Sequence, residues 1–328
     1  MPSKKLTSLE ICAGGGGQAL GLEAAGFNHL ALVDNDTFAV ATLQANRPSW
    51  NVYEEDVKSF LKSDTAQFVG EIDLLGGGVP CPPFSIAGKQ LGHEDERDLF
   101  PTALSLARKL KPRAVMLENV RGLLDPRFHG YRNAVDAKFK AMGFRSEWRL
   151  LNASDFGVPQ LRPRVVCVAL KTALWDHFSW PEPTTPNGSA LTVGEVLLPL
   201  MAAGGWAGAK QWAAKADRVA PTLVGGSKKH GGPDLGPTRA RKAWAELGVD
   251  GIGLANEPPS KGFAGNPKLT VQMAALIQGF PPEWEFTGGK TAAYRQVGNA
   301  FPPPVAEAVA KQIAKALRAA DREAGKKA

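Results

Sequence analysis

The sequence is poor in cysteine and has no long apolar run, and both shortages limit what the protein can be. Its 328 residues include three cysteines, Cys12, Cys81 and Cys167, which lie too far apart to form a Cys-x-x-Cys pair. Neither a disulfide framework nor a cysteine zinc site is therefore expected, and His93 and His129 show no metal-ligand spacing with any cysteine. No run of about 18 apolar residues occurs, so no membrane span is expected either. These shortages indicate a protein of a reducing cytosol that holds no metal.

A secretory signal is missing too, since the basic N-terminus lacks a long apolar stretch that ends in a cleavage site. The composition is that of a globular protein, with 44% hydrophobic and 22% charged residues. The length allows one large domain, or a domain with a smaller one attached. The formal net charge of +7 favours a polyanionic partner without defining one.

The first half of the chain alternates short apolar runs with amphipathic stretches. Strands are predicted at residues 8–12, 29–33, 72–75 and 114–117, and helices at residues 18–25, 37–46, 99–110 and 131–142. Residues 144–171 then indicate two more strands joined by a loop, which finish the sheet. Strands and helices that alternate in this way predict an α/β fold, with a doubly wound, mostly parallel sheet between two layers of helices.

After Lys171 the composition changes, and residues 172–268 hold many Pro, Gly, Trp and Ala residues. Residues 225–242 carry five basic side chains against one acidic side chain, a pattern that fits either phosphate contact or a solvated loop. Further on, apolar residues recur at every fourth position from Val305 to Leu317. This spacing predicts a final helix with one buried face.

The segment LEICAGGGGQALGL is predicted to form a strand, a glycine turn and a helix. Asp34 lies twenty residues after Gly14, at the end of the next predicted strand, where a carboxylate can accept hydrogen bonds from ribose hydroxyls. Asp56 follows the next apolar position and is expected near the same edge, within reach of an adenine amino group. No Gly-Lys-Ser/Thr follows the glycines, which argues against a triphosphate loop. Nicotinamide and S-adenosylmethionine sites share this layout, and the turn alone does not separate them.

Cys81 lies in GGGVPCPPFSIAGKQ, a stretch whose prolines exclude a helix interior and a central strand. Glu118 and Asn119 end an apolar strand, where burial is expected to raise the pKa of the Glu118 carboxyl. Arg162 and Arg164 precede another strand, with side chains on the same face. Ligands of open parallel sheets bind beyond the carboxyl ends of the strands, so the glycine turn, the cysteine loop and Glu118 are expected to meet there.

In their order and spacing, several motifs resemble those of the cytosine-carbon-5 DNA methyltransferases: GGGVPCPPFSIAGKQ, ENV, QLRPR, LTVQMAALIQGFPPEW and YRQVGNAFPPPVAEAVA. The resemblance covers residues 7–171 and 268–318. It implies a Rossmann-like catalytic domain made of residues 1–171 and 291–328, which binds S-adenosylmethionine, and a target-recognition domain of residues 172–290. It further implies a monomeric, sequence-specific enzyme of the bacterial cytoplasm or nucleoid that acts on double-stranded DNA. In restriction-modification systems its functional partner would be a cognate restriction endonuclease.

The resemblance also assigns roles to individual residues. Cys81 resembles the nucleophile that bonds cytosine carbon 6, Glu118 resembles the acid that protonates ring nitrogen 3, and Asn119 would support that pocket. Arg162 and Arg164 would contact the base and the cysteine loop. The S-adenosylmethionine site would comprise Ala13, Gly14, Gly16, Gly17, Asp34, Asn35, Asp56, Val57, Pro80, Asn299 and Ala300. The DNA contacts would come from Ser85, Lys89, Gln90, Lys228, Lys229, Arg239 and Arg241.

Three alternatives remain open at this point. The tRNA-methylating branch of the family shares the catalytic motifs, but its Cys-Phe-Thr segment does not occur in this sequence. A nicotinamide-dependent oxidoreductase would leave Cys81, Glu118 and QLRPR unexplained, and a catalytically silent DNA-binding homologue would not need the first two. Two positions depart from residues frequent in the family: Cys12 stands where Phe is common, and Asn35 where a bulky side chain is common. Cys12 and Cys167, both in apolar strands, are expected in the core.

Overall fold

The computed structural model describes residues 5–80, 98–185, 189–226 and 232–327 of the chain. Six residues with a predicted role lie outside these ranges, namely Cys81, Ser85, Lys89, Gln90, Lys228 and Lys229. None of the helices in the described ranges combines the length and the apolar composition that crossing a bilayer needs.

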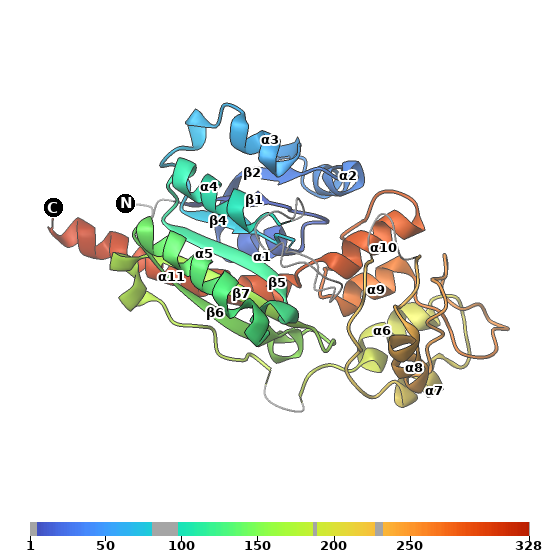
Figure 1. Cartoon of the computed structure of the whole chain (residues 1–328). Coiled ribbons are helices and arrows are strands. Elements are labelled where there is room, and N and C mark those ends of the chain that lie inside the picture. The colour runs from blue at the N-terminus through green and yellow to red at the C-terminus, as the bar shows by residue number, and fades with distance from the viewer. Residues whose placement is uncertain (1–4, 81–97, 186–188, 227–231, 328) are drawn as a thin grey trace.

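A mixed sheet of seven strands forms the centre of the molecule, in the order β3-β2-β1-β4-β5-β7-β6 (Figure 1). The strands are β1 (Leu6–Ile11), β2 (Phe27–Asp34), β3 (Val52–Glu54), β4 (Leu74–Gly77), β5 (Ala114–Val120), β6 (Phe144–Asn152) and β7 (Pro163–Lys171). The first five run parallel, and β7 runs antiparallel to both of its neighbours. The predicted α/β fold and its strands are confirmed. The short strand β3 was missed, because three residues are too few to show a pattern.

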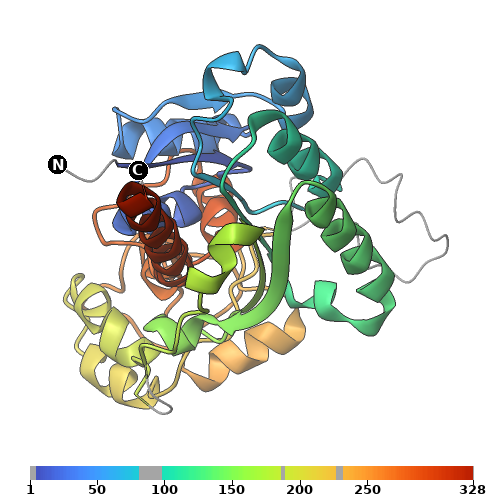
Figure 2. The same ribbon diagram turned by 90° about the vertical axis from the view of Figure 1, so that its left-hand side faces the viewer.

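Helices cover both faces of the sheet, as alternation along the strands requires. The connecting helices are α1 (Gly17–Ala24), α2 (Thr37–Asn46), α3 (Val57–Lys62), α4 (Phe100–Leu110) and α5 (His129–Ala141). On one face, Leu9 and Ile11 of β1 pack in a common core with α3, α4 and α5. On the other face, Leu6 packs in a core with α1 and the last helix, and Figure 2 shows that helix end-on beside the sheet.

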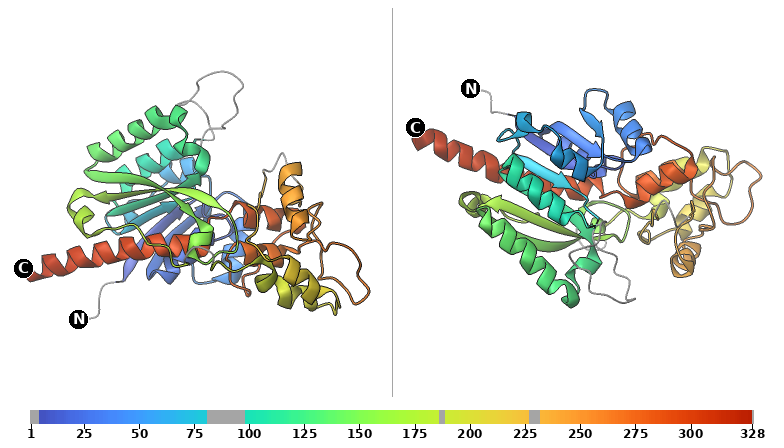
Figure 3. Two further views of the ribbon diagram at one scale, coloured as in Figure 1. Left: turned by 90° about the horizontal axis from the view of Figure 1, so that it is seen from below. Right: turned by 45° about the horizontal axis from the view of Figure 1, so that its top comes forward.

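The last helix, α11 (Pro303–Lys327), comes from the far end of the chain and completes this second layer. Its predicted stripe is confirmed, since Val305, Val309, Ile313 and Leu317 are all buried against Leu74, Met116 and other strand residues. The C-terminal end of α11 extends beyond the sheet, at the end of the molecule opposite the helices of residues 193–299 (Figure 3).

A mainly helical region lies beyond the carboxyl ends of the parallel strands (Figure 1). It contains α6 (Val193–Ala202), α7 (Ala209–Lys215), α8 (Thr238–Glu246), α9 (Val271–Ile277) and α10 (Lys290–Asn299). Its core is built on Trp212 and Trp244 and continues without interruption to Leu32 and Leu43 of the first region. The indole of Trp284 donates a hydrogen bond to the carbonyl oxygen of Gly15 at 3.0 Å. The predicted domain boundary at residue 290 stays a prediction, and this contact ties residues before that boundary to the glycine turn.

Candidate active site at the carboxyl edge of the sheet

A hollow of about 230 Å³ opens where the parallel strands end. The first half of the chain contributes Glu10, Cys12, Ala13, Gly14, Gly15, Gly17, Gln18, Asp34, Asp36, Ala39, Gly78 and Glu118 to its walls. The remaining wall comes from the end of α10 and the turn after it, with Arg295, Gln296, Asn299, Ala300 and Phe301. The hollow therefore joins the glycine turn, the acid after β2 and the end of β5, as the sequence predicted.

Close packing of Leu43, Trp284 and Phe301 against the glycine turn leaves no room for side chains at Gly16 and Gly17. Gly16 has φ 90°, and a Cβ there would lie 2.8 Å from side-chain atoms of both Leu43 and Trp284. A Cβ on Gly17 would overlap the carbonyl oxygen of Phe301. Only glycine fits both positions, and the turn can therefore bring its backbone to the edge of the hollow.

Asp34 is held in the wall of the hollow by two backbone N–H groups. Gly14 donates to its Oδ2 and Asp36 donates to its Oδ1, both at 2.8 Å. These bonds fix the carboxylate beside the turn, at the position expected for a ribose-binding acid. Asp36 also caps α2 and forms an ion pair with Arg295 at 3.1 Å. This pair was not predicted, because Arg295 lies 259 positions after Asp36 in the chain.

Two buried polar side chains in the hollow have no hydrogen-bond partner among the described residues. They are Glu10 of β1 and Gln18 of α1, and both carboxylate oxygens and both amide atoms are unsatisfied. Burial, and secondarily the charge of Asp34, raises the pKa of Glu10 well above its usual range. Gly76 pairs with Glu10 in the sheet, and a Cβ there would lie 2.6 Å from Nε2 of Gln18. Unsatisfied buried groups that face a cavity suit a polar ligand. A glutamate inside an otherwise apolar strand was the signal that could have revealed them.

Glu118 meets Arg164 at the end of β5. Because β7 is antiparallel, Val120 pairs with Arg164, and the Arg164 Nε lies 2.8 Å from Oε1 of Glu118. Both side chains are about one-tenth exposed. Burial raises the pKa of Glu118, an effect that Arg164 and then Arg162 oppose. A carboxyl in this setting keeps its proton to a higher pH than an exposed one and can donate it to a base.

The segment leading to Cys81 starts beside Glu118. Asn119 donates from Nδ2 to the carbonyl oxygen of Val79 at 2.8 Å. A Cβ on Gly78 would lie 3.3 Å from Oε2 of Glu118. The backbone at residues 78 and 79 therefore lies against the acid, two residues before the cysteine.

The guanidinium of Arg162 is bonded mainly to backbone carbonyl oxygens. Its side chain is fully buried, and its guanidinium donates to the carbonyl oxygens of Leu223 at 2.8 Å, Gly298 at 2.7 Å and Ala300 at 3.0 Å. Burial lowers the pKa of Arg162 well below its usual range. In the described part of the chain its two Nη atoms bond to these carbonyl oxygens and its Nε has no partner, so the contact of Arg162 with the base and the cysteine loop stays a prediction.

The other predicted cofactor residues divide into two groups. Ala13, Gly14, Gly17, Asp34, Asn299 and Ala300 line the hollow, whereas Gly16, Asn35, Asp56, Val57 and Pro80 do not. Asp56 caps α3 by accepting from the N–H of Lys58 at 2.8 Å. The cofactor role of this second group stays a prediction. Cys167 is buried as predicted, whereas Cys12 is partly buried: it packs against the core and also lines the hollow.

Helix α8 presents the basic residues predicted to bind DNA. Arg239 and Lys242 are exposed, and Arg241 is half-buried with its guanidinium donating to Oγ1 of Thr238 at 3.3 Å. Trp244, one turn after Arg241, is fully buried and anchors the helix to the core. The helix therefore holds its positive charges toward solvent on a rigid support.

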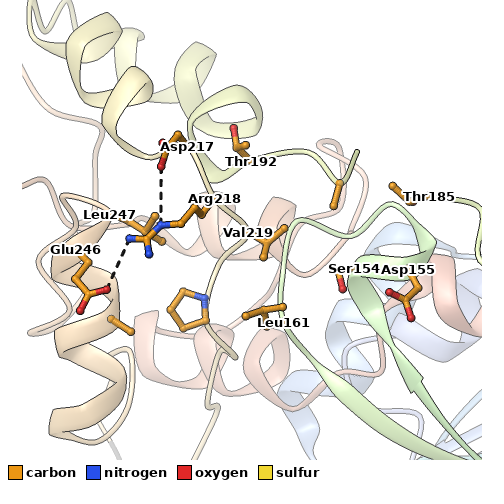
Figure 4. Close-up of a pocket in the computed structure, with 13 residues that line it drawn as sticks. Ser154, Asp155, Leu161, Thr185, Thr192, Asp217, Arg218, Val219, Glu246 and Leu247 are labelled. Carbon is orange, nitrogen blue, oxygen red and sulfur yellow. Dashed lines mark ion pairs between the residues drawn. The ribbon is translucent and has the colours of Figure 1, made fainter. Parts of the chain in front are cut away.

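A larger hollow of about 530 Å³ lies between the sheet region and the helical region (Figure 4). The guanidinium of Arg218 sits there between Asp217 at 3.9 Å and Glu246 at 3.7 Å. Asp155 adds a third carboxylate, and the Arg218 side chain is 59% exposed. Charges exposed to solvent are screened and offer little for chemistry, so we place the active site in the smaller hollow.

The fold and the hollow together define a class of protein. A mostly parallel sheet with one antiparallel strand near its edge, a glycine turn after β1 and an acid at the end of β2 form the fold of the S-adenosylmethionine-dependent methyltransferases. The solved structure of DNMT2 from Spodoptera frugiperda has this fold, with a TM-score of 0.63 at 18% identity over 94% of this chain and 99% of that chain.

The chain belongs to the C-5 cytosine-specific DNA methylase family, whose model matches residues 6–315. It is similar to the Type II methyltransferase M.NaeI of Lentzea aerocolonigenes, with 59% identity over 96% of this chain and 76% of the relative. It is also similar to the Type II methyltransferase M.NgoMIV of Neisseria gonorrhoeae, with 53% identity over 96% of this chain and 99% of the relative. The identification from motifs is confirmed: the protein is a sequence-specific DNA (cytosine-5-)-methyltransferase, and the oxidoreductase alternative is wrong.

Proposed function

We propose that the enzyme flips a cytosine out of double-stranded DNA and methylates its carbon 5 through a covalent bond to Cys81. The observation that supports this most directly is the buried Glu118–Arg164 pair, whose acid lies beside Gly78 and lines the hollow. An acid, a cation and the approach to a thiol meet at one edge. That combination suits addition of a thiolate to an electron-poor ring.

The chain's own groups would act in sequence. The Cys81 thiolate adds to carbon 6 while the Glu118 carboxyl gives its proton to ring nitrogen 3, so that no charge builds up on the ring. A free cysteine, with a pKa of ~8.5, is only a few per cent thiolate at neutral pH, and a nearby guanidinium such as that of Arg164 favours the charged form. After methylation, the carbon 5 proton is lost to a base, Cys81 leaves carbon 6 as a thiolate, and the nitrogen 3 proton returns to Glu118, which restores the aromatic ring and the acid.

The hollow suits S-adenosylmethionine, which supplies an electrophilic methyl group on a sulfonium. The glycine turn gives close access to backbone groups, and Asp34 is positioned for ribose hydroxyls. Glu10 and Gln18 offer unsatisfied oxygens to an ammonium group, and Asn299 and Ala300 close the opposite wall. We assign these residues to cofactor binding, and Gly16, Asn35, Asp56, Val57 and Pro80 remain candidates for the adenosine end.

DNA would lie across the carboxyl edge of the sheet. The reacting carbon cannot be reached inside a duplex, and extrusion of the base costs about a few kcal/mol. Phosphate contacts from Arg239 and Arg241 on α8 would offset that cost. Ser85, Lys89, Gln90, Lys228 and Lys229 are assigned to the same surface from the sequence alone.

A nucleotide analogue tests the covalent step. A target duplex with 5-fluorocytosine cannot lose the substituent at carbon 5, so the enzyme and cofactor should form a stable adduct, visible by denaturing electrophoresis and mass spectrometry. Cys81→Ala should form none, and the matched Cys167→Ala should form it as the wild type does, since that thiol is buried in β7. Absence of an adduct with wild-type enzyme and cofactor would count against the mechanism.

The biological setting is proposed from the relatives' names, which are those of Type II methyltransferases. We assign this enzyme to a restriction-modification system of the bacterial cytoplasm, as a monomer that protects DNA from a cognate endonuclease. Bisulfite sequencing of DNA from cells that express the enzyme would reveal the methylated site. Labelled methyl transfer to duplex DNA but not to tRNA would exclude the RNA-modifying alternative.

A further inference from the structure

Arg162 is a buried cation whose partners are all neutral. In the described part of the chain it bonds to three backbone carbonyls and, at 3.4 Å, to the side-chain oxygen of Gln160. Its neighbour Arg164 has a carboxylate, Glu118, at 2.8 Å. A buried guanidinium without a carboxylate is costly to desolvate, and its fork geometry allows it to hold several acceptors in fixed positions.

The three carbonyls belong to two different parts of the molecule. Gly298 and Ala300 lie at the end of α10, where Ala300 forms part of the wall of the cofactor hollow. Leu223 lies 61 residues after Arg162, in the helical region that precedes α8. A single side chain therefore bridges the cofactor wall and the recognition region.

Glutamine side chains reinforce the bridge. Gln160 accepts from the N–H of Leu223 at 2.9 Å and donates to the carbonyl oxygen of Ile277 at 3.1 Å. It also donates to Oε1 of Gln278 at 2.7 Å, and Gln278 in turn donates to the carbonyl oxygen of Ala300. Leu223 and Ala300 are each held twice by this buried network.

The two bridged segments are also packed with no room between them. A Cβ on Gly225 would lie 2.6 Å from Oδ1 of Asn299, and a Cβ on Gly298 would overlap the backbone of Gly225. Asn299, a residue of the hollow, donates to the carbonyl oxygen of Gly226 at 3.1 Å. A shift of the cofactor wall therefore has to move residues 223–226 as well.

Residues 223–226 also contact the turn before the basic helix. A Cβ on Gly236, in the turn before α8, would lie 3.3 Å from the side chain of Val224. Arg239 and Arg241 follow within one and a half turns of helix. The path from the cofactor hollow to the charges of α8 runs entirely through contacts between described residues.

We propose that Arg162 is a positioning residue that couples cofactor binding to DNA binding, and does not itself contact the flipped base. The inference rests on the proposed function, in that the wall at residues 298–300 belongs to the cofactor site and α8 contacts DNA. Cofactor in the hollow holds residues 298–300 in one position. Because Arg162 bonds to both Ala300 and Leu223, the position of Leu223 is then restricted too, and with it that of α8. Coupling of this kind is reciprocal, so DNA must tighten cofactor binding by the same factor.

The test measures both affinities in the full-length protein. The dissociation constant of a target duplex is measured by fluorescence anisotropy with and without S-adenosylhomocysteine, and that of S-adenosylhomocysteine by calorimetry with and without duplex. The wild type should show equal enhancement in both directions, on the order of 5-fold or more. Arg162→Lys keeps the charge but loses the fork, and should bind each ligand alone while the enhancement falls toward one.

Two further variants make the result specific. Gly225→Ala leaves Arg162 intact but separates the packed segments, so it should also lose the enhancement. If Arg162→Lys does not fold, the result for Gly225→Ala decides whether the two sites are coupled through this contact. Arg113→Lys is the matched control, because Arg113 bonds to Asp73 and Asp321 away from the hollow and should keep the full enhancement. Wild-type enhancement in Arg162→Lys, or none in the wild type, would overturn the coupling. Failure of the wild type to bind either ligand would instead overturn the proposed function.

Discussion

The two hollows of this enzyme hold their charges in opposite ways. In the smaller one, at the carboxyl edge of the sheet, Glu10 is buried with no hydrogen-bond partner among the described residues, and Glu118 is buried against Arg164. In the larger one, Arg218 stands in solvent between two carboxylates. Keeping charged groups out of water costs free energy that exposed pairs do not require. In this enzyme the active site is therefore indicated by polar groups that are kept out of water. The volume of a cavity does not indicate where the reaction takes place.

The largest effect should come from the buried acid of the smaller hollow. Glu118→Gln keeps the shape but cannot donate a carboxyl proton, so methyl transfer should fall by about 10²- to 10⁴-fold at saturating substrates. Because burial raises the pKa of Glu118, the wild-type rate should lose this proton donor as the pH rises through that raised pKa, and the variant should lack this dependence. Tritium transfer across a pH series measures both. A rate within ten-fold of the wild type would remove Glu118 from the mechanism.

A smaller effect is expected on α8, outside both hollows. Arg239→Ala together with Arg241→Ala should weaken DNA binding roughly ten-fold and reduce the salt dependence of log K by about one unit per arginine that contacts a phosphate. Anisotropy titrations at several salt concentrations give both quantities. Unchanged salt dependence would show that α8 does not face the DNA backbone, and S-adenosylhomocysteine affinity in the absence of DNA serves as the control.

Substitution of Glu10 measures how much the burial of this carboxyl lowers the free energy of unfolding. Burial, and secondarily the charge of Asp34, raises the pKa of Glu10 in the folded protein. The contribution of Glu10 to the free energy of unfolding is therefore fully present below about pH 4.3, the pKa of a free carboxyl. It is lost as the pH rises through the raised pKa. Without ligand, Glu10→Gln should therefore be more stable than the wild type at pH 8, by about 1–3 kcal/mol, with the gap closing toward pH 4. Thermal melts across this range provide the measurement.

The ligand-bound melts complete that test. If Glu10 faces the ammonium group of the cofactor, S-adenosylhomocysteine should raise the melting temperature of the wild type more than that of Glu10→Gln. Equal pH profiles for the two proteins, with equal ligand shifts, would show that Glu10 is neither strained nor part of the site.

The smallest effect is expected in the larger hollow. Arg218→Ala removes both of its ion pairs, yet exposed pairs contribute about 0–1 kcal/mol, so stability should change by no more than this and methylation should stay within two-fold of the wild type. Thermal melts and the same tritium assay apply. A loss comparable to that of Glu118→Gln would reverse the comparison between the hollows.

Prediction from sequence succeeded where local pattern and topology agree. Most strands, four of the helices between them and the stripe of α11 follow from periodicity, and the rule that parallel strands deliver ligands at their carboxyl ends brought Asp34 and Glu118 together. The short elements β3 and α3 were missed, and none of the helices α6 to α10 was predicted; the segments of α6 and α7 are rich in Gly, Ala and Trp and lack a clear period.

The parts of the site that escaped prediction depend on distant contacts. Arg295 reaches Asp36 across 259 positions, and Arg162 reaches Leu223 and Gly298 across 61 and 136. The motif QLRPR predicted that its arginines matter but could not tell which one faces the acid. The antiparallel pairing of β7 with β5 decides that, since it sets Arg164 beside Glu118 and directs Arg162 to the helical region.

The late position of α11 has a consequence for how the protein is made. The sheet is complete at Lys171, but the helix that covers Leu6, Leu74 and Met116 begins at Pro303. A ribosome adds about 5–20 residues per second, so this apolar face stays bare on the order of ten seconds after the last strand has emerged. Each newly made molecule passes through a stage in which the core cluster that α11 completes is exposed, and exposed apolar surface promotes aggregation. A fragment that stops before α11 would remain at that stage.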